Sequence, residues 1–356
     1  MEISELGEFG LIDRLAKDIT TKSKTTVKGI GDDCAVLSPT AGMQTVVTTD
    51  LLVEGVHFDL TYVPLRHLGY KAVMVNLSDV FAMNAEPRQV TVSLAISSKF
   101  QVEDIEELYA GMRMACAKWG ADIVGGDTTA SMNGLVISIT AIGEARSEDI
   151  VMRNGAKPTD LVCVSGNLGA AYMGLQLLER EKAIYNDQVE EARRSGSKEQ
   201  MEALREAQPD FSGREYILER QLKPEARGDI IEALRKAGIR PTSMMDISDG
   251  LSSELLHICR QSQTGCRIYE ERLPLDYQTA AMAEELNLNV STCALNGGED
   301  YELLFTVPLS MNDTVSALDD VHVIGYITEP EKGCALITRD GGEHQLKAQG
   351  WKHLQP

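Results

Sequence analysis

The chain has 356 residues, and its 54 acidic against 34 basic side chains give a formal net charge of −20. This length predicts two domains, each large enough to bury a core of its own. The acidity argues against nucleic acid or an anionic membrane as a partner, because both are bound through clustered Lys and Arg.

The seven cysteines are scattered along the chain and include no Cys-x-x-Cys pair. An odd number without such pairs fits neither a disulfide framework nor a zinc site, so we expect reduced, mostly buried thiols. The amino-terminal segment lacks the apolar core of a signal peptide. The longest uncharged stretches, residues 128–143 and 161–178, are interrupted by Gly, Ser and Asn, which is untypical of membrane spans. These features predict a cytoplasmic protein.

Helical and strand patterns alternate through the first part of the chain. Apolar residues recur every three or four positions in the expected helices and every second position in the expected strands. In chain order we expect helix over 5–19, strand over 44–49 running into Asp50, helix over 65–83, strand over 89–96, helix over 103–119, and strands over 122–124 and 134–142.

A polar stretch with Gly and Pro at residues 145–160 predicts the domain boundary. The two domains would then span residues 1–148 and 149–356. The second contains a charged stretch at about 179–208, which predicts an exposed helical insertion without catalytic content. Its other expected elements are strands over 161–166, 244–247, 303–307, 321–327 and 335–338, and a helix over 252–261. The alternation favours an α/β or α+β layered fold.

Five segments each place an aspartate directly after an apolar run. They are GIGDD (29–33), TVVTTD (45–50), NLSD (76–79), VGGDTT (124–129) and MMDISDG (244–250). Ligands of layered folds bind where strands end, although any single aspartate there is more often a helix cap or turn residue. Converging carboxylates need cations, and oxygen ligands without His or Cys favour Mg²⁺ or Ca²⁺. Carboxylates spread over five loops suit several Mg²⁺ ions held against a polyphosphate.

The common nucleotide-binding and nucleophile signatures are missing. The chain has no G-x-x-x-x-G-K-[ST], no H-R-D with D-F-G, no G-x-S-x-G and no contiguous EF-hand loop. A nucleotide-dependent enzyme with this sequence must belong to another family.

Seven ordered motifs resemble the thiamine-monophosphate kinase family, which is related to aminoimidazole ribonucleotide synthetase and selenophosphate synthetase. The motifs are GIGDDCAVL (29–37), TTDLLVEGVHF (48–58), YKAVMVNLSDVFAMNAEP (70–87), GGDTT (125–129), MRNGAKP (152–158), MMDISDGLSSEL (244–255) and NGGEDYELLFT (296–306). The resemblance implies two α/β domains. It also implies that the amino-terminal domain binds ATP and Mg²⁺, and that its sheet pairs into a barrel across a homodimer.

The resemblance further implies ATP-dependent phosphorylation of thiamine monophosphate to thiamine diphosphate with several Mg²⁺ ions. The implied metal ligands are Asp33, Thr48, Thr49, Asp50, Asp79, Asp127, Asp246 and Asp249. The implied ATP contacts are Gly126, Asp127, Arg153 and Ser248. The implied substrate contacts are His57, Glu299 and Trp351, of which Trp351 follows the family pattern least closely.

The acceptor in this reaction is itself a phosphate. A phosphomonoester has its second pKa near ~6 and is mostly dianionic at neutral pH, so we expect no catalytic base or nucleophile. Lys71 and Lys157 could reach phosphate, but spacing alone does not decide between this and a structural role. Two alternatives remain open: another ATP-dependent enzyme of the superfamily, forming a cyclised amidoribotide or selenophosphate, and a non-catalytic protein that binds divalent cations.

Overall fold

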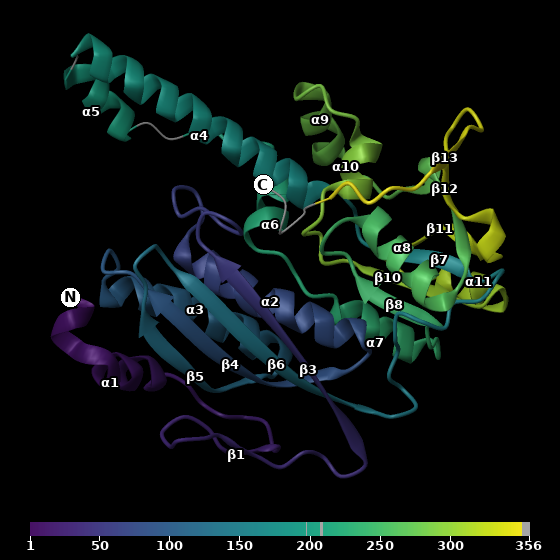
Figure 1. The fold of residues 1–356 in the computed structure, drawn as a ribbon, viewed down its shortest axis with the longest axis horizontal. Coiled ribbons are helices and arrows are strands. Elements are labelled where there is room, and N and C mark those ends of the chain that lie inside the picture. The colour runs from purple at the N-terminus through teal and green to yellow at the C-terminus, as the bar shows by residue number, and fades with distance from the viewer. Residues whose placement is uncertain (197, 207–208, 351–356) are drawn as a thin grey trace.

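The computed structural model describes residues 1–196, 198–206 and 209–350. Two main β-sheets, each flanked by helices, form the mixed α/β arrangement predicted from the sequence (Figure 1). A separate two-stranded sheet near the amino terminus consists of β1 (Thr26–Lys28) and β2 (Val36–Leu37). Among the described residues, none of the helices is both long enough and apolar enough to cross a bilayer.

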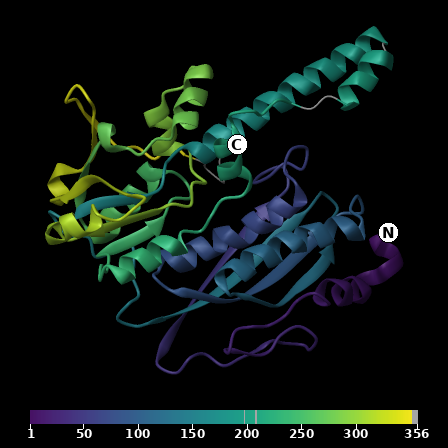
Figure 2. The same ribbon diagram turned by 180° about the vertical axis from the view of Figure 1, so that it is seen from behind.

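The first main sheet has four strands in the order β3-β6-β4-β5. Its elements, with their flanking helices, are α1 (Ile3–Ala16), β3 (Met43–Val53), α2 (Leu65–Ala82), β4 (Glu86–Ile96), α3 (Val102–Trp119), β5 (Asp122–Ala130) and β6 (Val136–Arg146). Strands β3, β6 and β4 are antiparallel, whereas β5 runs parallel to β4. Helices α2 and α3 cover one face of this sheet (Figure 2).

Two glycines let α2 and α3 cross at very short distance. A Cβ on Gly69 would lie 1.9 Å from the Leu108 carbonyl oxygen, and one on Gly111 would lie 1.9 Å from the Arg66 carbonyl oxygen. Since such distances are far below van der Waals contact, each helix requires glycine at its crossing point. The close crossing fixes α2, which carries several of the predicted site residues.

The second main sheet has seven strands in the order β13-β12-β9-β11-β7-β10-β8. Its strands are β7 (Leu161–Ser165), β8 (Ser243–Asp246), β9 (Gly265–Tyr269), β10 (Leu303–Val307), β11 (Val321–Thr328), β12 (Cys334–Ile337) and β13 (Glu343–Gln345). The helices of this half are α4 (Ala170–Ser195), α5 (Lys198–Glu206), α6 (Glu215–Leu222), α7 (Gly228–Lys236), α8 (Leu251–Ser262), α9 (Tyr277–Glu285), α10 (Val290–Asn296) and α11 (Asn312–Val315). Short 3₁₀ turns lie at Glu270–Arg272, Leu309–Met311 and Pro330–Lys332.

The charged stretch predicted as an insertion is helical. Helix α4 starts at Ala170, runs through the first part of this stretch, and is followed by α5. The distal part of α4 and α5 project away from both sheets as an arm (Figures 1 and 2).

One hydrophobic core extends from the first sheet into the second. The largest buried cluster contains Leu77 of α2 and Ile139 of β6 together with Ile230 of α7 and Phe305 of β10. The predicted boundary after residue 148 lies in the connection between β6 and β7. The two sheets are therefore joined by a continuous core that includes residues of α2 and α7.

Asp246 is the last residue of β8, within the predicted strand over 244–247, and Asp79 lies in the last turn of α2, within the predicted helix over 65–83. The expected strand ends before Asp50 and Asp127 are wrong, because both residues lie within β3 and β5. Strands β3 and β5 continue past their aspartates because their neighbours keep pairing with them residue by residue. Asp33 lies in an exposed irregular loop.

Candidate active site

A cavity of ≈ 1110 Å³ lies between the two sheets. Strand β3, the following residues 55–63 and one side of α2 line it from the amino-terminal half. The start of α4, the loop after β8, α10 and residues 297–301 line it from the carboxy-terminal half. This volume is in the upper range for small-molecule sites and exceeds what one drug-sized ligand fills.

Three carboxylates from three different elements lie at the junction of the two sheets. They are Asp50 of β3, Asp79 of α2 and Asp246 of β8, and all three line the cavity. The Thr48 hydroxyl donates to Asp79 Oδ2 at 2.6 Å, and the Ser78 hydroxyl donates to Asp246 Oδ2 at 2.6 Å. Hydroxyl donors orient these carboxylates without neutralising them.

Burial raises the pKa of all three carboxylates, and for Asp50 and Asp246 neighbouring negative charge adds to the effect. Burial, with a contribution from the Asp79 charge, raises the pKa of Asp50 to about 6. Burial, followed by the charge of Asp79, raises the pKa of Asp246 to about 7. Burial also raises the pKa of Asp79, although the Thr48 hydroxyl and the Arg153 guanidinium partly oppose this. Raised acid pKa values mean that the protein supplies too little positive charge here, which is the electrostatic signature of a site for a cation.

The donor set at this junction consists of oxygens. Carboxylates and hydroxyls are the ligands that Mg²⁺ prefers, and Mg²⁺ typically takes one or two protein carboxylates and fills its shell with water and phosphate oxygens. Asp50, Asp79 and Asp246 with the adjacent Thr48 therefore fit such an ion. The predicted ligand Asp249 lies close by, in the loop after β8, and also lines the cavity.

The loop after β8 is held by hydrogen bonds to the segment before β10. The Glu299 and Tyr301 amides donate to the Ser248 and Ile247 carbonyls at 2.7 and 2.9 Å. The side chain of Ser248 is exposed to the cavity. The Asp249 amide donates to Glu254 at 3.1 Å. Glu254 is buried, and this burial raises the pKa of its carboxyl to about 8. Sequence reasoning did not identify Glu254, because a glutamate in a helical pattern gives no sign that it is buried.

Two of the predicted substrate contacts line the cavity. The Val53 amide donates to His57 Nδ1 at 3.1 Å, which fixes the imidazole ring next to β3. Glu299 forms an ion pair with Lys71 at 3.0 Å and accepts a hydrogen bond from Gln221 at 3.0 Å. Lys71 is only 4% exposed and also donates to the Gln221 carbonyl. Trp351 lies outside the described residues, directly after Gln349 and Gly350, which line the cavity.

The remaining predicted residues that the structure describes do not line the cavity. Gly126 and Asp127 are on β5, at the opposite edge of the first sheet from Asp50. The Thr49 hydroxyl donates to the Ile139 carbonyl at 3.1 Å and accepts from Thr140, so it points away from Asp79. Arg153 is exposed but close enough to Asp79 to lower its pKa. The side chain of Lys157 is exposed, and Asp33 is not among the residues that line the cavity.

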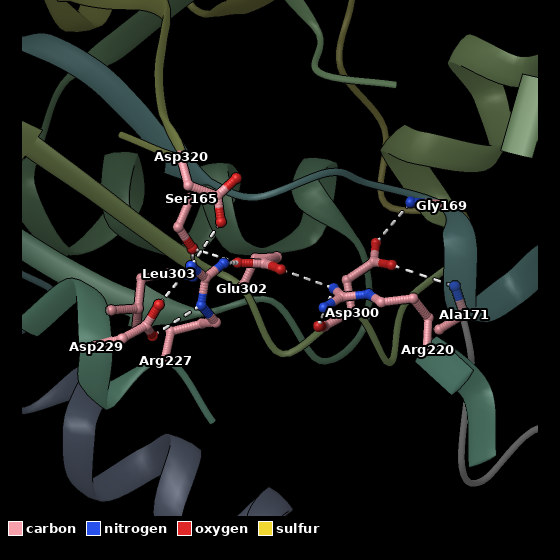
Figure 3. A network of polar contacts seen from close by, with 10 residues as sticks. All are labelled: Ser165, Gly169, Ala171, Arg220, Arg227, Asp229, Asp300, Glu302, Leu303 and Asp320. Carbon is pink, nitrogen blue, oxygen red and sulfur yellow. Dashed lines mark hydrogen bonds and ion pairs between the residues drawn. The ribbon is translucent and has the colours of Figure 1, made fainter. Parts of the chain in front are cut away.

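Asp300 caps the helix that forms one wall of the cavity. Its carboxylate accepts from the Gly169 amide at 2.8 Å and the Ala171 amide at 3.5 Å, at the start of α4 (Figure 3). The side chain is fully buried, and this burial raises its pKa to about 6 despite the opposing effect of nearby Arg220. Asp300 therefore positions α4 and does not face the ligand.

Glu302 ties three segments together two residues further on. It forms ion pairs with Arg220, at 2.8 Å, and with Arg227, and it accepts from the Ser165 hydroxyl at 2.5 Å (Figure 3). Arg220 and Arg227 are mostly buried, and Glu302 is 1% exposed. In the motif NGGEDYELLFT, Glu299 thus faces the cavity, while Asp300 and Glu302 hold the surrounding framework.

The chain is similar to several characterised proteins. The family described as "AIR synthase related protein, N-terminal domain" matches residues 31–145. The thiamine-monophosphate kinase of Bacillus subtilis (strain 168) is 32% identical over 98% of this chain and 100% of its own. The thiamine-monophosphate kinase of Aquifex aeolicus (strain VF5) is 34% identical over 99% of this chain and 100% of its own.

Solved structures give the same assignment. "AaThiL complexed with AMPPCP and TMP" is 32% identical, covers 99% of both chains and superposes with a TM-score of 0.73. Thiamine-monophosphate kinase from Stenotrophomonas maltophilia K279a is 29% identical, covers 96% of this chain and 98% of its own, and has a TM-score of 0.76. Full-length similarity at this level, together with the seven motifs, shows that the chain belongs to the thiamine-monophosphate kinase family.

Proposed function

We propose that the protein transfers the terminal phosphate of ATP to thiamine monophosphate and so forms thiamine diphosphate. The observation that carries this proposal is the cluster of Asp50, Asp79 and Asp246 at the base of the cavity between the sheets. The full-length relatives named thiamine-monophosphate kinase support the substrate, and the relative bound to AMPPCP and TMP supports the nucleotide.

Mg²⁺ is the cation that we propose for the carboxylate cluster. Asp50, Asp79, Asp246 and Asp249 would hold it, with Thr48 beside them. Bound Mg²⁺ would neutralise the phosphate oxygens that otherwise repel each other in an in-line transfer. Ser248 and Arg153 lie next to this cluster and would contact the ATP phosphates, Arg153 in the bidentate manner typical of guanidinium.

The chain's own contribution to the transfer is positioning. A phosphate acceptor needs no base, and the Nδ1 of His57 already accepts a hydrogen bond from the Val53 amide. Lys71 holds Glu299 in place through the ion pair, so its carboxylate can face the positively charged thiazolium ring of the substrate. Lys71 is therefore proposed as a positioning residue and not as a phosphate ligand.

A second chain is proposed to complete the site. Asp127 pairs with Ser93, Ser93 with Ser138, and Ser138 with Leu51, so Asp127 and Leu51 lie on one row across the sheet. Three strand spacings place the two ends of this row about 14 Å apart, too far for one ion to bind both Asp50 and Asp127 of one chain. In a homodimer whose sheets close into a barrel, the β5 edge of one chain would approach the β3 edge of the other.

Exposed side chains on β3 support this dimer. Val47 and Leu51 are 64% and 53% exposed on an edge strand, where apolar residues invite pairing with another chain. We further propose that residues 1–148 form the domain that dimerises and binds ATP, that Asp33, Thr49, Gly126 and Asp127 act at the shared site, and that the enzyme works in the cytoplasm.

The activity is tested with the full chain, Mg²⁺, ATP and thiamine monophosphate, by measuring thiamine diphosphate and ADP. We expect equal amounts of both products, and none when thiamine replaces thiamine monophosphate, because the acceptor must be a phosphate. Failure to form thiamine diphosphate would overturn the proposal. Binding of Mg²⁺ without any turnover would instead favour a non-catalytic cation-binding protein.

The shared site is tested by mixing two inactive variants, Asp50→Asn and Asp127→Asn, by co-expression. If both residues of one site come from different chains, each mixed dimer keeps one intact site, and a random mixture recovers about a quarter of the wild-type activity. If both come from one chain, no mixed dimer has an intact site. Absence of recovery would therefore refute the shared site without affecting the proposed reaction.

A further inference from the structure

Three cysteines far apart in the sequence meet on the side of the second sheet that α8 covers. Cys259 lies in the last turns of α8, Cys266 on β9 and Cys334 on β12. Cys266 and Cys334 are direct partners in the parallel register of β9 and β12. The three sulfur atoms lie within 4.8 Å of one another. The sequence predicted scattered thiols and no zinc site, because the chain has no Cys-x-x-Cys pair and the six residues between Cys259 and Cys266 match no common metal motif.

The separation of the sulfurs fits a shared ion better than a disulfide. Two thiolates on one zinc ion, each bonded at about 2.3 Å, lie about 3.8 Å apart. A disulfide needs about 2.05 Å and a specific dihedral angle, which directly paired residues of neighbouring strands reach only with strain. An ion could therefore bind after side-chain movements of an ångström or less.

The three sulfurs differ in their access to solvent. Cys259 and Cys266 are 2% and 0% exposed, whereas Cys334 is partly exposed and opens a path to solvent. The guanidinium of Arg267 donates to the Cys266 and Gly333 carbonyls and so lies next to β9 and the sulfurs.

Charge and ligand number select the kind of ion. Three thiolates with one divalent ion leave a single negative charge next to Arg267, whose guanidinium also pairs with Glu343 at 2.5 Å. Thiolates prefer soft, thiophilic ions, whereas Mg²⁺ prefers oxygen. In the part of the chain that the structure describes, the group has three members, so the fourth position of a tetrahedral ion falls to water on the Cys334 side.

We propose that Cys259, Cys266 and Cys334 form a three-thiolate site for a thiophilic divalent ion of the zinc class, separate from the cavity between the sheets. Each thiol that binds releases its proton to solvent. The ion would clamp the end of α8 to β9 and β12. Because α8 begins directly after the loop that carries Ser248 and Asp249, the clamp would also hold that loop.

The test is a Cd²⁺ and Zn²⁺ titration of the full chain, kept reduced without competing thiols and with excess Mg²⁺ to occupy the oxygen ligands. Cd²⁺ bound to thiolates produces sulfur-to-metal charge-transfer absorption in the ultraviolet, which carboxylate binding does not. We expect the absorption to saturate at one ion per chain, Zn²⁺ to displace it, and Zn²⁺ to raise the melting temperature.

Cys334→Ser and Cys259→Ser remove one ligand each, and Cys34→Ser removes an exposed thiol elsewhere as the control. Cys334→Ser should lower the affinity for Zn²⁺ at least about 100-fold, which is more than the loss of a group that only hydrogen-bonds to a ligand usually causes. Cys34→Ser should leave the affinity unchanged. Cys334 is only partly buried, so its variant should fold, and circular dichroism verifies this. The proposal is refuted if no charge-transfer absorption develops, if it persists in both ligand variants, or if two of the three cysteines form a disulfide and exclude the ion.

Discussion

Asp50→Asn separates the electrostatic role of Asp50 from any role in folding. The substitution keeps the size of the side chain and removes one negative charge from the cluster with Asp79 and Asp246. Its backbone amide, which donates to Asn76 Oδ1 at 3.1 Å, is unaffected. We therefore expect a folded protein that has lost its proper cation site.

The structure gives the size of the effect on stability. Burial and the Asp79 charge raise the Asp50 pKa from 3.8 to about 6, which corresponds to about 3 kcal/mol at about 1.4 kcal/mol per pH unit. The folded protein holds this proton more tightly than the unfolded chain, so the wild type loses stability as the pH rises from about 4 to about 6. Without metal, Asp50→Asn should equal the wild type near pH 4 and exceed it by up to about 3 kcal/mol at pH 8.

The effect on turnover has the opposite sign. One charge interaction at 4 Å is worth about 4 kcal/mol at an effective dielectric near 20, so losing it should slow phosphate transfer about a hundredfold to a thousandfold. Urea unfolding in the presence of a chelator measures the stability, and formation of thiamine diphosphate measures the turnover. Asp276→Asn is the matched control, because Asp276 caps α9 through the Gln278 amide and Asn caps equally well. The reasoning fails if Asp50→Asn is less stable than the wild type at pH 8 without metal, or if its turnover stays within a few-fold of normal.

Three further substitutions test the framework around the cavity. Glu299→Gln leaves the ammonium of buried Lys71 without its counter-charge, so the free energy of unfolding in urea should fall by about 1–3 kcal/mol. We also expect a higher KM for thiamine monophosphate. A normal KM would show that Glu299 does not contact the substrate. Asp300→Ala removes the cap of α4 and should lower the free energy of unfolding by about 1–2 kcal/mol. Asp300→Asn keeps a capping oxygen and should restore most of this stability. Equal losses of stability in both variants would contradict the capping role. Gly126→Ala places a Cβ 1.7 Å from the Val92 carbonyl oxygen and should lower the melting temperature by several degrees. Gly125→Ala is the control, because a Cβ there meets no atom within 4 Å, and it should lower the melting temperature far less. Similar melting temperatures for the two variants would argue against close packing at β5.

Local patterns predicted most of the elements. Helices α2 and α3 begin and end within a residue of the predicted ranges, because apolar spacing is strong there and a capping box at Gln101 with a left-handed Gly120 marks the ends of α3. Strand β3 was predicted to stop at Thr49 but continues to Val53, since its neighbour β6 keeps pairing with it. Where a strand ends is decided by its partner, which local sequence does not reveal.

The candidate site was predicted only in part for the same reason. Asp50, Asp79 and Asp246 were identified by motif, and the structure brings them together from β3, α2 and β8. The pairing of Lys71 with Glu299 joins residues more than two hundred positions apart, and the three cysteines around β9 meet only because β12 pairs with it. Such contacts depend on sheet order, and no periodicity along the chain encodes sheet order.

The acidity of the chain has two separate meanings. Most of the −20 charge lies on the surface and opposes binding of nucleic acid. The few carboxylates at the cavity instead couple the binding of ATP to the binding of Mg²⁺. ATP alone would meet several like charges at about 4 kcal/mol each, while Mg²⁺ alone would meet carboxylates whose pKa values of about 6 and about 7 leave them partly protonated near neutrality. Each ligand therefore needs the other, so ATP and Mg²⁺ should bind together, and more tightly as the pH rises from 6 to 8.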